Sequence, residues 1–99
     1  MFIAGSPLPT DNKFPFGAIL ITPGAEDVIA ECENAVPEFL AKHGRLEQGL
    51  LSDSDQKSNE AALKSGARIF SSFKIHGEKV WIITEADRSS TTFLLPDEY

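Results

Sequence analysis

Residues 80–96 constrain the fold most, because they read as two β-strands joined by a polar turn. Residues 80–84 are β-branched or aromatic, and such side chains pack well on a pleated sheet. Side chains alternate along a strand, so Ile82 faces one side while Trp81 and Ile83 face the other. A strand with large apolar groups on both sides is expected to be central in its sheet.

Two further strands flank this one in the sequence. Residues 91–95 alternate more weakly, and Pro96 ends that strand because proline lacks the N–H group that continues a ladder. Residues 69–75 also alternate, and residues 76–79 read as a tight turn that leads into the central strand. The pattern therefore predicts three consecutive antiparallel strands.

The first half of the chain predicts one strand and three helices. Residues 16–21 form a short apolar run that stops at Thr22 and Pro23, which suit a helix cap and a first helical position. Because proline breaks a helix interior, we expect a second helix to begin at Pro37 and to end at Gly44. A third helix is expected from Ser52 to Gly66.

These elements predict an α+β fold in the order β-α-α-α-β-β-β. The helices are expected to pack on one face of an antiparallel sheet. Residues 13–99 are expected to form a single domain. Residues 1–12 are rich in proline, glycine and polar side chains, and we expect a flexible arm there.

Composition excludes several functional classes. Fifteen acidic and nine basic residues give a net charge of −6, which disfavours direct binding to nucleic acid or to anionic membranes. A single cysteine cannot form an internal disulfide, and no charged n-region with an apolar run opens the chain, so we do not expect secretion. No apolar run approaches the ~20 residues of a membrane helix. We therefore expect a cytoplasmic protein.

One turn concentrates reactive side chains, namely Glu85, Asp87 and Arg88. Two carboxylates beside an arginine could perform acid–base chemistry or hold a hard cation, as in a small hydrolase or metal-dependent enzyme. The simpler interpretation is turn formation, in which Asp87 bonds its own backbone and Arg88 pairs with a carboxylate. We favour the simpler interpretation, and we expect no catalytic residue.

Histidine and cysteine do not indicate a metal site or a cofactor. His43, His76 and Cys32 show no recognised ligand spacing. Cys32 lies on the apolar stripe of the first helix, which predicts a small core residue rather than a nucleophile paired with His43.

Acidic residues gather in the helical half of the chain. They form either an ordinary solvated face or a surface that offers negative charge to a basic protein partner. The candidate partner-binding residues, with the turn included, are Glu26, Asp27, Glu31, Glu33, Glu38, Asp53, Asp55, Glu85, Asp87 and Arg88.

A homodimer is a third possibility, because both faces of the sheet are predicted to be apolar while only three short helices can cover them. Phe70, Trp81, Ile83 and Leu94 are the candidate dimer contacts.

Several segments together resemble a small bacterial and phage family often labelled plasmid-related proteins. The most specific are residues 81–89, Trp-Ile-Ile-Thr-Glu-Ala-Asp-Arg-Ser, and residues 94–99, Leu-Leu-Pro-Asp-Glu-Tyr. Family members usually carry Gly-Asp-Trp-Gly where this chain has residues 46–49, Leu-Glu-Gln-Gly. The resemblance implies an accessory protein of a mobile genetic element.

Charge, size and resemblance lead to one functional expectation. We expect a non-enzymatic protein-binding module that inhibits a host defence system of the CRISPR or restriction type. Its expected partner is a nucleic-acid-binding defence effector.

Overall fold

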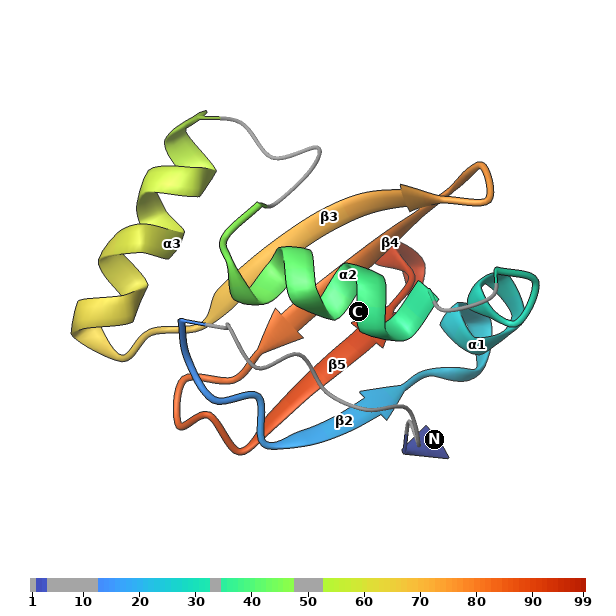
Figure 1. Ribbon diagram of the computed structural model, residues 1–99, viewed down its shortest axis with the longest axis horizontal. Coiled ribbons are helices and arrows are strands. Elements are labelled where there is room, and N and C mark those ends of the chain that lie inside the picture. The colour runs from blue at the N-terminus through green and yellow to red at the C-terminus, as the bar shows by residue number, and fades with distance from the viewer. Residues whose placement is uncertain (1, 4–12, 33–34, 48–52) are drawn as a thin grey trace.

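The computed structural model describes residues 2–3, 13–32, 35–47 and 53–99 (Figure 1). Its strands are β1 (Phe2–Ile3), β2 (Ala18–Ile21), β3 (Ile69–Ile75), β4 (Glu78–Thr84) and β5 (Ser90–Leu94). Its helices are α1 (Pro23–Ile29), α2 (Ala35–Gly44), α3 (Asp53–Ser65) and the short 3₁₀ helix η1 (Pro96–Glu98). The strands form one sheet in the spatial order β1-β2-β5-β4-β3.

The predicted α+β class and element order are confirmed, and α2 lies across one face of the sheet (Figure 1). β3, β4 and β5 are consecutive antiparallel strands, with β4 between the other two. The prediction of an antiparallel sheet fails for β2, which runs parallel to β5 with Ile19 opposite Thr91, so the sheet is mixed. A tight turn forces antiparallel pairing, but β2 reaches β5 through three helices and two strands, so no turn sets its direction.

The start of α2 differs from the prediction, and most of the predicted N-terminal arm is not described by the structure. α2 begins at Ala35 rather than at Pro37, because proline is tolerated in the first turn, where its missing N–H group would have no helical partner. The predicted arm, residues 1–12, lies outside the described residues except for Phe2–Ile3, which pairs antiparallel with β2.

The main core lies between the helices and one face of the sheet. Leu40 of α2, Val80 and Ile82 of β4 and Phe93 of β5 are completely buried there. The opposite face of β4 and β5 carries Ile83 and other apolar side chains outside this core cluster. The helical layer therefore covers only one of the two apolar faces.

A polar network crosses this core. His43 of α2 is completely buried, and its Nδ1 and Nε2 lie 2.5 Å from Ser71 Oγ and 2.9 Å from Thr84 Oγ1. Thr84 bonds Thr91 at 2.7 Å, and Thr91 donates to the Phe16 carbonyl at 2.8 Å. Burial lowers the pKa of His43 to about 3, so the ring is neutral at pH 7. The network joins α2 to three strands.

The C-terminal segment is fixed to the start of α1. Thr22 caps this helix as predicted, with its hydroxyl accepting from the Ala25 N–H. The Glu98 carboxylate accepts from Thr22 Oγ1 at 2.5 Å, from the Gly24 N–H at 3.0 Å and from the Leu95 N–H at 2.9 Å. These hydrogen bonds, the one from Thr22 most strongly, lower the pKa of Glu98.

Candidate functional site

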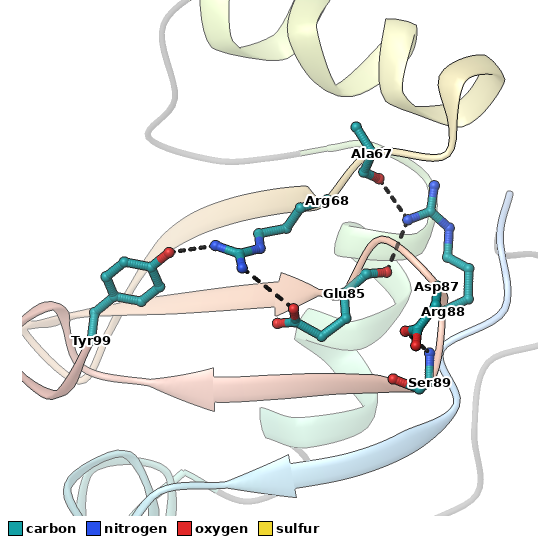
Figure 2. A network of polar contacts seen from close by, with 7 residues as sticks. All are labelled: Ala67, Arg68, Glu85, Asp87, Arg88, Ser89 and Tyr99. Atoms are coloured by element: carbon teal, nitrogen blue, oxygen red, sulfur yellow. Dashed lines mark hydrogen bonds and ion pairs between the residues drawn. The ribbon is translucent and has the colours of Figure 1, made fainter.

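Arg88 occupies a structural position in the turn between β4 and β5 (Figure 2). Its Nη1 donates to the carbonyls of Ala67 at 2.7 Å and Glu85 at 3.1 Å, and its Nη2 donates to that of Ala62 at 3.1 Å. The predicted pairing of Arg88 with a carboxylate is replaced by these three carbonyl contacts. Ala62 lies in the last turn of α3, so Arg88 caps this helix and fastens it to the turn.

The two carboxylates of the turn point to different partners (Figure 2). Asp87 Oδ1 accepts from the Ser89 N–H at 3.0 Å, and hydrogen bonds to Ser89 lower the pKa of Asp87. Glu85 Oε1 lies 3.4 Å from Arg68 Nη2, and Arg68 also donates to the hydroxyl of Tyr99. Joint use of the two carboxylates, as an acid–base pair or as ligands of one cation, would require them to converge on one point, and they engage separate partners instead. Among the described residues, no group of three or more His, Cys, Asp or Glu side chains is arranged so that it could hold a metal ion.

The four candidate dimer contacts share one face of the sheet, opposite the helices. The strand register places Phe70 opposite Ile83 and Trp81 opposite Leu94. The rings of Phe70 and Trp81 lie 5.0 Å apart, and Tyr99 packs on Trp81 at 5.9 Å. Ile83 and Leu94 are buried, whereas Phe70 and Trp81 are half-buried and Tyr99 is 71% exposed. Tyr99 could not be predicted as part of this face, because no local pattern places a residue beyond Pro96.

The candidate acidic residues divide between two ends of the molecule. Glu26, Asp27, Glu31 and Glu38 are exposed on α1, just after it, and in the first turn of α2. Asp55 is exposed on α3, which lies at the opposite end of the helical layer (Figure 1). Glu33 and the side chain of Asp53 lie outside the described part of the chain. The predicted acidic surface is therefore concentrated at the α1 end, which we call the acidic end and define by Glu26, Asp27, Glu31 and Glu38.

An apolar hollow lies at this acidic end. Its volume is about 250 Å³, and it is open to solvent. It is lined by Ile21, Glu26, Ile29, Ala30 and Val36. β2, α1 and α2 each contribute an aliphatic side chain, and Glu26 of the acidic end contributes the charge. The hollow can receive an apolar side chain next to a positive charge.

The pairing of Cys32 with His43, which was the less favoured alternative in the sequence, does not form. His43 is buried in the core, so it is not the partner of Cys32. Cys32 is half-buried against the core, and its Sγ lies 3.5 Å from Nδ1 of His76. This contact could not be predicted from local patterns, because 44 residues separate the two side chains.

Comparisons with known proteins found no family model, curated protein or solved structure that matches this chain. The resemblance to plasmid-related proteins therefore stays a prediction. No helix in the described ranges is both long enough and apolar enough to cross a membrane.

Proposed function

We propose that this chain is a non-enzymatic protein-binding module whose contact surface is the acidic end of its helical layer. The supporting observation is the open apolar hollow lined by Ile21, Ile29 and Val36, with Glu26 in its wall. Two kinds of interaction coincide at this place. An anchoring side chain can be buried in the hollow while exposed carboxylates attract its basic surroundings.

The distribution of charge supports a basic partner. Residues 14–41 contain five carboxylates and no lysine or arginine, so no basic residue of this segment offsets the acidic end. α3 differs, because Asp55 is followed there by Lys57 and Lys64. A basic protein segment with a protruding apolar side chain therefore fits the α1 end better than the α3 end.

The biological role that we propose is inhibition of a defence effector encoded by the host of a mobile element. A carboxylate surface can occupy the basic groove in which a CRISPR or restriction effector binds nucleic acid. The net charge of −6 and the resemblance to plasmid-related proteins support this role, which would be exercised in the cytoplasm.

A plasmid-immunity assay tests this role. Cells with an active CRISPR or restriction system would express the wild-type chain or the triple variant E26Q/D27N/E38Q and be transformed with a targeted plasmid. The wild type should raise transformation efficiency, and the triple variant should not. The double variant D55N/E60Q removes charge from α3 and should behave as the wild type. An equal effect of the wild type and the triple variant would contradict a role for the acidic end.

Self-association is a second candidate function, and the partly exposed aromatic face opposite the helices favours it. Phe70, Trp81 and Tyr99 form a continuous row of rings on the sheet face that the helices leave uncovered. The same face on a second copy would provide a complementary apolar surface across a two-fold axis. Light scattering over a range of concentrations should then give a dimer mass that Trp81→Lys abolishes. A monomer mass at all concentrations would eliminate this candidate.

A further inference from the structure

A cluster of a thiol, an imidazole and a carboxylate lies beside α1 and uses none of the residues of the β4–β5 turn. Cys32 follows α1, and His76 is in the turn between β3 and β4. Cys32 Sγ is 3.5 Å from His76 Nδ1. On the other side of the ring, His76 Nε2 is 2.9 Å from Glu31 Oε2.

The contact with Glu31 determines which ring nitrogen of His76 carries the proton and which one has the lone pair. A carboxylate can only accept a hydrogen bond, so Nε2 of His76 carries a proton that it donates to Glu31. In the neutral ring, Nδ1 then has the lone pair and accepts from the S–H group of Cys32. Cys32, His76 and Glu31 are therefore arranged as nucleophile, base and orienting carboxylate, in the same order as in enzymes with an activated thiol.

The backbone holds this arrangement in an accessible place. His76 and Gly77 have φ angles of +52° and +82°, which are typical of a two-residue hairpin turn. The His76 ring contacts Glu31 and Cys32, which follow α1. The side chains of His76 and Glu31 are 52% and 66% exposed, and Cys32 is half-buried against the core. Cys32 is therefore held in position by its neighbours while the residue stays partly exposed to solvent.

We propose that Cys32 is a modification site that reacts with low-molecular-weight disulfides, with His76 as its base and Glu31 as the positioning residue. His76 Nδ1 takes the thiol proton, and the thiolate attacks one sulfur of the disulfide. A new S–S bond to Cys32 forms while the old S–S bond breaks. The departing thiolate takes the proton from His76 and leaves as a thiol. One disulfide is consumed and one is formed, so the exchange needs no other oxidant.

Glutathione disulfide is the probe that tests this proposal. The rate of mixed-disulfide formation on the full chain would be followed at pH 7 by intact mass, in the native state and after unfolding in urea. Native Cys32 should react about tenfold faster than unfolded Cys32, which is less than the roughly 10²–10⁴-fold that a positioned base typically contributes, because this base is exposed to water. Cys32→Ser should give no adduct.

His76→Asn is the decisive variant, because asparagine suits a left-handed turn position and so preserves the hairpin while the base is removed. Its native rate should fall about tenfold, to that of the unfolded chain, with an unchanged circular dichroism spectrum. Glu31→Gln should also slow the reaction, whereas Asp27→Asn, which removes the same charge without touching His76, should not. A native rate equal to the unfolded rate, or an undiminished rate in His76→Asn, would overturn the proposal. Equal slowing by Asp27→Asn and Glu31→Gln would overturn the positioning role of Glu31.

Discussion

The imidazole of His43 and the hydroxyl of Thr84 meet at 2.9 Å in the centre of the core, although 41 residues separate them in the chain. His43 is completely buried with both ring nitrogens hydrogen-bonded, and burial lowers its pKa to about 3. The folded state therefore holds a neutral ring at pH values where the unfolded chain binds a proton.

This difference predicts acid sensitivity. The pKa of His43 lies below its ordinary value of 6.5. The contribution of His43 to the free energy of unfolding is therefore complete above pH 6.5 and is lost as the pH falls from 6.5 towards 3. The slope should be about 1.4 kcal/mol of unfolding free energy per pH unit from this residue. Urea unfolding of the wild type and His43→Gln at pH 7, 5.5 and 4 isolates this effect from that of the carboxylates. Parallel pH profiles of the two proteins would contradict the prediction.

Arg88 should matter for stability through its shape as well as its charge. Arg88→Lys should cost about 2 kcal/mol of unfolding free energy, because an ammonium group cannot reach the carbonyls of Ala62, Ala67 and Glu85 together. Urea denaturation measures this loss. Asp87→Asn keeps an oxygen that can accept from the Ser89 N–H, so it should change stability little. A lysine variant as stable as the wild type would show that the cap is unimportant.

Gly17 and Gly66 form a matched pair that separates steric contact from backbone strain. Both have positive φ angles, +67° and +75°. A Cβ atom at Gly17 would lie 2.3 Å from the Ser89 carbonyl oxygen, whereas one at Gly66 would meet nothing within 4 Å. Gly66→Ala should therefore cost about 1 kcal/mol for the left-handed conformation alone. Gly17→Ala should cost several times more, and thermal unfolding would check the order. Equal losses would contradict the close approach.

The sequence was sufficient for the hairpin of β3 and β4, which depends on neighbours in the chain. Alternation along residues 80–84 placed Ile82 and Trp81 on opposite faces. A tight turn joins β3 to β4 as expected, but it takes only His76 and Gly77, because β4 already begins at Glu78. These features follow from the geometry of strands and two-residue turns.

Features that depend on distant contacts could not be predicted. The parallel direction of β2, the contact of Glu98 with α1 and the pairing of His76 rather than His43 with Cys32 each require the path of the whole chain. The candidate acidic residues show the same limit. Sequence placed them on helices, but only the arrangement of α1 and α3 shows that they divide between two ends.

Affinity capture at the acidic end tests the central proposal most directly. Tagged wild type, the triple variant E26Q/D27N/E38Q and the α3 variant D55N/E60Q would be incubated with host lysate and quantified by mass spectrometry at low and high salt. We expect the wild type and the α3 variant to retain a basic protein at low salt and to release it at high salt. The triple variant should fail to capture this protein. Capture of the same proteins by the triple variant, or no partner for the wild type, would contradict it.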